Sequence, residues 1–135
     1  MLSKKAQYAL KALSYLAARY QEGPVLISEI AEKKAVPLKF LENILLDLKK
    51  AGVLDSKKGK GGGYFLKSAP ENTHLANVIR TIDGPIALLP CVSLYFYERC
   101  RDCEEKNCRI RLVFTEARDA VLQVLENKTL LDISE

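Results

Sequence analysis

The chain has 135 residues and a globular composition, with 48% hydrophobic and 28% charged residues, seven Gly and five Pro, which excludes a disordered or fibrous protein. This length can bury one modest core, and no apolar run is long enough to cross a bilayer. The N-terminus has neither a continuous apolar stretch nor a small-residue cleavage site, so we expect a cytoplasmic protein that does not associate with a membrane.

The net charge of +4 is unevenly distributed along the chain. Residues 1–67 carry 13 Lys or Arg against 6 Asp or Glu, whereas residues 68–135 carry 8 against 11. This asymmetry suggests a half that binds a polyanion, joined to a half with another task. We expect one part at residues 1–68 and a second at residues 69–135, the latter holding a linker helix, a cysteine loop (91–108) and a final helix.

Three short helices are predicted in the first part. Ser3 can cap a helix that runs to about Tyr20, and Ser28 can cap a brief second helix. A third helix begins after Pro37 and ends at Gly52. Two short helices separated by a tight turn, the second with an exposed polar face, are typical of a helix-turn-helix, although an ordinary helical hairpin gives the same pattern. The predicted buried stripe of the third helix is Leu41, Ile44, Leu45 and Leu48.

A basic, glycine-rich hairpin follows the third helix. Strand candidates at 53–56 and 64–66 flank the segment KKGKGGG. Such a loop can bring its backbone close to phosphates and carry positive charge there, although a flexible polar hairpin is the simpler interpretation. A nucleotide-binding P-loop is disfavoured, because the G-x-x-x-x-G-K-S/T pattern is absent and the loop joins two strands.

A helix-turn-helix followed directly by a basic hairpin predicts a mainly α winged-helix fold that binds double-stranded DNA. The third helix would enter the major groove, where Asn can read adenine and a carboxylate can accept from cytosine, while the wing contacts phosphates or the minor groove. The predicted DNA-binding residues are Ser28, Leu38, Lys39, Phe40, Glu42, Asn43, Lys57, Lys58, Lys60, Gly61, Gly62, Gly63 and Tyr64.

The second part begins with a helix capped by Asn72 or Thr73 and ended by Gly84, and it closes with a long helix to about Asn127. A long helix at the end of a small chain finds little surface in its own core. It is therefore predicted to pack against a second copy, giving the homodimer that a palindromic operator requires. The predicted dimerisation stripe is Val113, Ala117, Ala120, Val121 and Val124.

All the cysteines of the chain lie in CVSLYFYERCRDCEEKNC, at Cys91, Cys100, Cys103 and Cys108. In a reducing compartment this density indicates metal or redox chemistry rather than structural disulfides. Four thiolates suit an iron-sulfur cluster or a tetrahedral zinc, although structural zinc usually takes two C-x2-C pairs and here there is one. A metal-free alternative is a redox disulfide between Cys100 and Cys103.

Two other functions explain the sequence less well. A small electron carrier would account for the cysteines but not for the basic hairpin, and the cysteine spacing matches neither ferredoxin pattern. A thiol enzyme would need a histidine partner, and the single histidine, His74, is distant in sequence. We therefore expect a protein that is not an enzyme.

The chain resembles the Rrf-type (Rrf-two) family of bacterial winged-helix regulators over nearly its full length. The resemblance rests on YALKALSYLA, PLKFLENILLDLKKAGVLDS, GKGGGYFL, VIRTIDGP and the cysteine segment. It implies a homodimeric DNA-binding repressor or activator, often with an iron-sulfur cluster (2Fe-2S or 4Fe-4S) in the loop before the dimerisation helix. It also places Glu42 and Lys58 where family members contact DNA.

The cysteine spacing departs from that family pattern. Cluster-binding relatives generally supply three cysteines and a fourth, different ligand, most often with five residues between successive cysteines. Here the spacing is C-x8-C-x2-C-x4-C. Four thiolates are therefore available as ligands, and either Cys100 or Cys103 can be dispensable. Tyr8 stands in the region from which some relatives donate an acidic ligand, so no fourth ligand is expected from the first helix.

Overall fold

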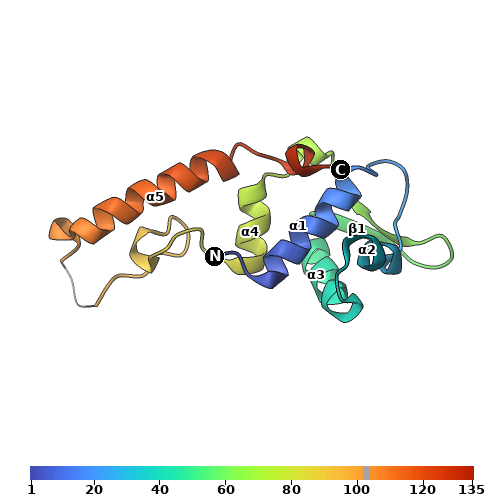
Figure 1. Ribbon diagram of the computed structural model, residues 1–135, viewed down its shortest axis with the longest axis horizontal. Coiled ribbons are helices and arrows are strands. Elements are labelled where there is room, and N and C mark those ends of the chain that lie inside the picture. Colours follow the sequence, from blue (N-terminus) through green and yellow to red (C-terminus); the bar gives the residue numbers. More distant parts are fainter. Residues whose placement is uncertain (102–103) are drawn as a thin grey trace.

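The computed structural model describes residues 1–101 and 104–135, and it has the mainly helical winged helix-turn-helix fold expected from the sequence. In the described residues, no helix combines the length and apolar character that a membrane span requires. Figure 1 shows an elongated molecule, with the winged-helix body at one side and α5 extending from it beside the cysteine loop. The helices and strands are α1 (Lys4–Ala17), α2 (Ile27–Lys34), α3 (Leu38–Lys50), β1 (Leu54–Lys57), β2 (Gly63–Leu66), α4 (Leu75–Asp83) and α5 (Arg109–Leu125), with 3-10 turns η1 (Pro70–Asn72), η2 (Pro90–Val92), η3 (Glu105–Asn107) and η4 (Leu130–Ile133).

Helix α1 is the centre of the core. Its N-cap is Ser3, as predicted, and the Ser3 Oγ accepts from the N–H of Ala6 at 3.0 Å. The helix ends at Ala17, three residues earlier than expected, and turns lead on to the extended Val25. It packs against α2, α3, α4, β2 and η4, so its buried side chains hold the body together. The core members of α1 are Ala9, Ala12, Leu13, Tyr15, Leu16 and Ala17.

Helix α2 starts one residue before Ser28, which corrects the predicted cap. Leu26 occupies the N-cap position without a side-chain hydrogen bond, and the N–H of Ile30 donates to its carbonyl. The reason is pairing over a distance: Val25 exchanges two backbone hydrogen bonds with Tyr64, at 2.8 and 2.9 Å, so the chain stays extended until Leu26. Ser28 is an exposed residue of the first turn.

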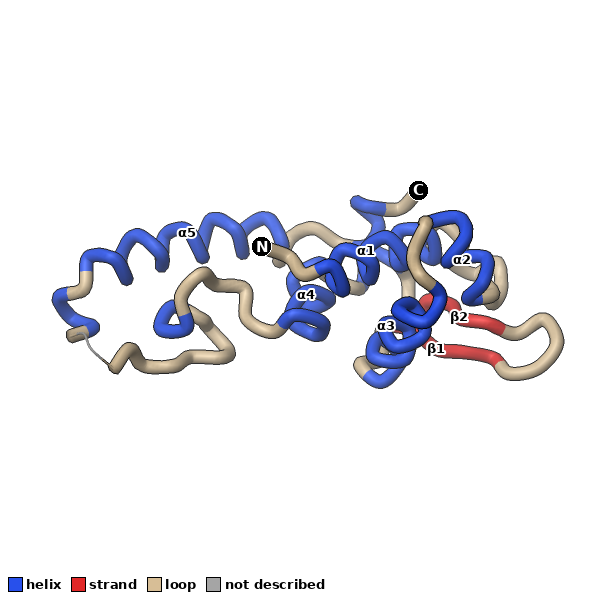
Figure 2. The backbone as a smooth tube through the Cα atoms, turned by 60° about the horizontal axis from the view of Figure 1, so that its bottom comes forward, coloured by secondary structure: helices blue, strands red, loops and turns tan. Residues whose placement is uncertain are grey.

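Helix α3 buries the predicted stripe completely, with Leu41, Ile44, Leu45 and Leu48 each 0% exposed. It is followed by Gly52 at φ 84°, a left-handed conformation that glycine adopts without strain and that ends the helix. The two strands then pair antiparallel, with Leu54 opposite Leu66 and Lys57 opposite Gly63. Figure 2 shows this hairpin extending away from the body beyond α3.

The segment after the hairpin returns to the same core. Helix α4 begins at Leu75 with His74 at its N-cap and no side-chain cap, so the predicted capping by Asn72 or Thr73 is wrong. The chain is held extended there because the N–H of Leu75 donates to Lys128 at 2.9 Å and the N–H of Leu130 donates to Thr73 at 3.0 Å.

The residues after α5 therefore close onto the winged-helix body. Leu130 is 0% exposed and lies in one hydrophobic cluster with the buried residues of α1 and α3. Glu135 accepts from the Ser14 hydroxyl of α1 at 3.2 Å and pairs with Lys34 of α2. The hydrogen bond from Lys34 lowers the pKa of the Glu135 carboxyl. These contacts tie the segment after α5 to both α1 and α2.

Replacing Leu130 by Ala should destabilise the fold by about 2–5 kcal/mol, because it leaves a cavity in a core that α1 and the C-terminal segment share. Urea unfolding of the two proteins would measure this free energy. Leu131→Ala is the matched control: Leu131 is 56% exposed, and its loss should change stability by about 0.5 kcal/mol or less. Equal effects of the two changes would contradict a core that includes this segment.

Candidate nucleic-acid interface and cysteine loop

The first turns of α3 present an exposed surface over a buried anchor. Leu38 and Phe40 are each 45% exposed, and Lys39 is exposed between them. Glu42 and Asn43 continue this surface, while the residue between Phe40 and Glu42 is buried in the core. A helix anchored along one face and polar along the other can lie in a major groove with its amide and carboxylate directed at base edges.

The wing carries a run of unbalanced positive charge. Lys57, Lys58 and Lys60 are all exposed, and the sequence has no acidic residue between Asp55 and Glu71. The wing is fixed to α3 at its base, where the Lys49 ammonium donates to the Ser56 hydroxyl at 2.7 Å. This contact joins the base of the wing to the last turn of α3.

Two of the predicted DNA-contact glycines are needed to shape the hairpin. A Cβ on Gly62 would lie 2.2 Å from the Lys57 carbonyl oxygen, and Gly62 is buried. Gly63 has φ 147°, and a Cβ there would lie 2.2 Å from the Val25 carbonyl oxygen. Gly61 is exposed at the tip, whereas the neighbouring Tyr64 is half-buried in β2. Gly62 therefore permits close backbone approach within the hairpin, and Gly63 permits close approach of the hairpin to the segment before α2.

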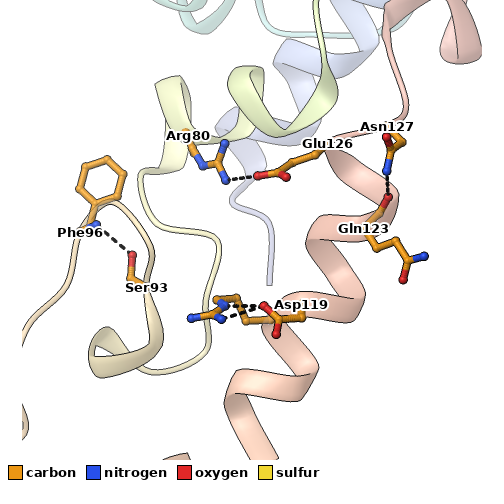
Figure 3. Close-up of polar contacts among 8 residues, drawn as sticks. Arg80, Ser93, Phe96, Asp119, Gln123, Glu126 and Asn127 are labelled. Atoms are coloured by element: carbon orange, nitrogen blue, oxygen red, sulfur yellow. Dashed lines mark hydrogen bonds and ion pairs between the residues drawn. The ribbon is translucent and has the colours of Figure 1, made fainter.

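The first half of the cysteine loop is packed against α5. Cys91 is 8% exposed and Val92 is 1% exposed, and the Val92 carbonyl accepts from Arg118 Nη1 of α5 at 2.7 Å. Ser93 Oγ accepts from the N–H of Phe96 at 3.0 Å, which closes a turn that Figure 3 shows beside α5. Cys91 is thus held in place by contacts that need no metal.

A second arginine links this half of the loop to two helices. The Arg80 guanidinium of α4 lies 4.5 Å from the centre of the Tyr95 ring, and Arg80 Nη2 lies 2.9 Å from the Glu126 carboxylate beyond α5. Figure 3 shows Arg80 reaching across to Glu126. Sequence reasoning did not identify Arg80 or Arg118, because each acts on a partner distant in sequence.

The second half of the loop meets the start of α5. Cys108 is the N-cap of α5, and its Sγ accepts from the N–H of Arg111 at 3.4 Å. The Tyr97 hydroxyl donates to the Glu105 carboxylate, which joins the two halves of the loop. This hydrogen bond raises the pKa of Tyr97, because it favours the protonated phenol. Cys100 is exposed, and the predicted ligand Cys103 lies outside the described residues.

The donor set fits a metal centre in its chemistry, because thiolates are the ligands that iron-sulfur clusters and zinc prefer. The described cysteines are not gathered, however: within residues 1–101 and 104–135, no three Cys, His, Asp or Glu side chains form a group that could hold a metal ion. Cys91 lies in η2, whereas Cys108 caps α5. The loop would have to bring these thiols together to bind a cluster.

The predicted dimerisation stripe is an unpaired face of α5. Val113 is 62%, Val121 46% and Val124 54% exposed, Ala120 is exposed and Ala117 is half-buried. One residue of α5, Leu122, is fully packed in the described structure. The stripe continues into an open apolar hollow of about 570 Å³ between α5, the end of α4 and the first residues of the chain.

Known proteins resemble the chain along its whole length. The family model of the Rrf2 proteins, described as iron-dependent transcriptional regulators, matches residues 2–135. An rrf2-like HTH-type transcriptional regulator of Rhodobacter capsulatus is 47% identical over 137 residues, covering 98% of this chain and 91% of that protein. These proteins are transcriptional regulators, not enzymes.

Solved structures agree with the sequence matches. CymR, the global cysteine regulator of B. subtilis, superposes with a TM-score of 0.83 at 31% identity, covering 99% of this chain and 95% of that chain. IscR of T. potens superposes with a TM-score of 0.79 at 26% identity, covering 98% of this chain and 85% of that chain. The chain therefore belongs to the Rrf2 family of HTH-type transcriptional regulators.

Proposed function

We propose that this regulator is a homodimeric repressor whose affinity for a palindromic DNA operator is set by an iron-sulfur cluster bound to the cysteine loop. The observation that carries the DNA-binding role is the joint exposure of the first turns of α3 and the three wing lysines, on two elements that pack directly on one another. Glu42 and Asn43 would read bases, and Lys57, Lys58 and Lys60 would contact phosphates.

The proposed dimer uses the exposed valines of α5. Val113, Val121 and Val124 are each about half exposed or more. Covering them with a second copy would stabilise the dimer, because it removes apolar surface from water. A two-fold dimer also sets the spacing between two recognition helices, which a palindromic site reads. In this proposal residues 1–68 bind DNA, and residues 69–135 provide the dimer interface and the cysteine loop.

The proposed cluster would be held by Cys91, Cys108 and one or both of Cys100 and Cys103. When bound, the cluster would supply redox and ligand-exchange chemistry, through which it could react with oxygen or nitric oxide. The description of the family as iron-dependent favours iron over zinc, but a zinc staple or a metal-free thiol switch uses the same residues.

The cysteine loop has a physical route to the DNA-binding surface. Arg118 bonds the Cys91 segment to α5, and Cys108 caps the same helix. The far end of α5 is held to the body through Glu126 and Leu130. A change in loop order can therefore bias the position of α5, and with it the spacing of the recognition helices in a dimer.

The wing lysines should act through phosphates. Changing Lys58 to Ala should weaken binding about equally across sequences and lower the slope of log affinity against log salt by about 0.9, whereas Asn43→Ala should relax preference at one base pair. The measurement is binding to a random-sequence duplex and to an operator selected from a random pool, over a range of salt. Lys128→Ala, at an exposed lysine after α5, is the control. An unchanged slope after changing Lys57, Lys58 and Lys60 together would contradict the proposal.

The α5 stripe should control assembly. Val121→Glu places a charge in the proposed interface and should give a monomer with normal helical content that binds the full palindrome far more weakly. Sedimentation velocity and far-ultraviolet circular dichroism measure both properties. Gln123→Glu, at an exposed position of the same helix, should remain dimeric. A wild-type protein that is monomeric at micromolar concentration with full operator affinity would overturn the dimer.

The cysteines should determine colour and operator affinity together. Protein purified without oxygen should be brown and contain iron and sulfide, and destroying the cluster should change operator affinity by about 5- to 150-fold. Cys91→Ala and Cys108→Ala should abolish the colour, whereas Cys100→Ala and Cys103→Ala can differ because one of these thiols can be spare. Colourless anaerobic protein with zinc bound, and with the same affinity in oxidant and reductant, would instead make the loop a structural staple.

A further inference from the structure

Helix α1 carries a positively charged face next to the recognition helix. It contains Lys4, Lys5 and Lys11 and no acidic residue, and the first acidic residue of the chain is Glu22. Lys5 is neutralised within the fold, because its ammonium lies 2.7 Å from the carboxylate of Asp47 in α3. Among the described residues, Lys4 and Lys11 have no carboxylate partner.

These two lysines are gathered on one aromatic ring. The Nζ of Lys4 lies 5.6 Å and the Nζ of Lys11 lies 5.9 Å from the centre of the Tyr8 ring. Positions 4, 8 and 11 fall on one face of a helix, so the ring can hold both ammonium groups through its negative π-face. Such contacts limit the freedom of two flexible side chains while leaving their charges available.

The ring also joins this face to the recognition helix. Tyr8 packs edge to face on Phe40, with ring centres 5.7 Å apart and an interplanar angle of 80°. Phe40 lies in the first turn of α3, beside the exposed Leu38 and Lys39. We call Lys4, Tyr8, Lys11 and Phe40 the Tyr8 cluster. In Figures 1 and 2, α3 lies between the first turns of α1 and the wing.

We propose that Lys4 and Lys11 contact the DNA phosphates on the side of the recognition helix away from the wing. This inference rests on the proposed DNA binding and adds a second phosphate-contact surface to it. The partner is phosphate rather than protein because the face carries two unbalanced cations and adjoins the helix expected in the groove. Cations on both sides of the groove would fix the tilt of α3 relative to the DNA and would also increase the affinity of the protein for DNA.

The test compares salt dependence among variants of the full chain. Lys4→Ala and Lys11→Ala should each lower the slope of log affinity against log salt by about 0.9, and the double variant by about twice that. Base preference on a selected operator should stay unchanged, because phosphate contacts carry no sequence information. Tyr8→Phe keeps the ring and should keep the slope, and Lys128→Ala is the matched charge control.

The possible failures are distinguishable. If wild-type binding does not depend on salt, the proposed DNA-binding function itself fails. If the wing triple variant lowers the slope but Lys4→Ala/Lys11→Ala does not, the proposed function stands and this inference is overturned. Dissociation of the dimer by the double variant in sedimentation, with an unchanged slope, would assign the Tyr8 cluster to a second copy and would equally overturn it.

Discussion

Burial of the apolar face of α1, which carries Ala9, Leu13 and Leu16, is the constraint on which the rest of the structure depends. The helix contacts α2, α3, α4, β2 and η4, and its buried side chains share one cluster with Leu45 and Leu130. Truncating a leucine in such a core costs about 2–5 kcal/mol, a large part of the stability of a small domain. The recognition helix and the root of α5 are therefore parts of one packed body, and their relative position cannot change without disrupting that core.

Helix α5 is fixed in a different way, at its ends. Its C-terminal end is joined to the core through Glu126, the paired backbone at 128–130 and Leu130. Along most of its length its apolar side chains are exposed, and on the loop side it is held by packing against the buried Cys91 and Val92 and by the hydrogen bond from Arg118 to the Val92 carbonyl. A long helix rooted in a rigid body and held weakly elsewhere can change its orientation without unfolding the body.

Local periodicity made much of this fold predictable from the sequence. The stripe of α3, the hairpin and the Ser3 cap depend on residues close together in the chain, and all three lie as expected. The predicted caps Ser28 and Thr73 are wrong because the backbone before each helix pairs with a distant partner, Tyr64 or Lys128. The roles of Arg80 and Arg118 depend on the same kind of contact, since Arg118 binds a carbonyl 26 residues away. The Tyr8 cluster likewise joins two helices that periodicity treats separately.

The magnitudes of these contacts indicate where a signal can act. A typical hydrogen bond contributes about 0.5–1.5 kcal/mol net, and one to a charged group such as the Arg118 bond about 1.5–3 kcal/mol. Coupling between a ligand and a distant site is typically about 1–3 kcal/mol, which matches the few polar contacts of the cysteine loop and falls below the cost of disrupting the α1 core. Cys108 Sγ accepts from the N–H of Arg111, so a cluster bound to this thiol would compete with the N-cap of α5. The polar contacts of the loop are thus weaker than the packing of the α1 core, so the loop can be rearranged at a smaller cost in free energy than the body.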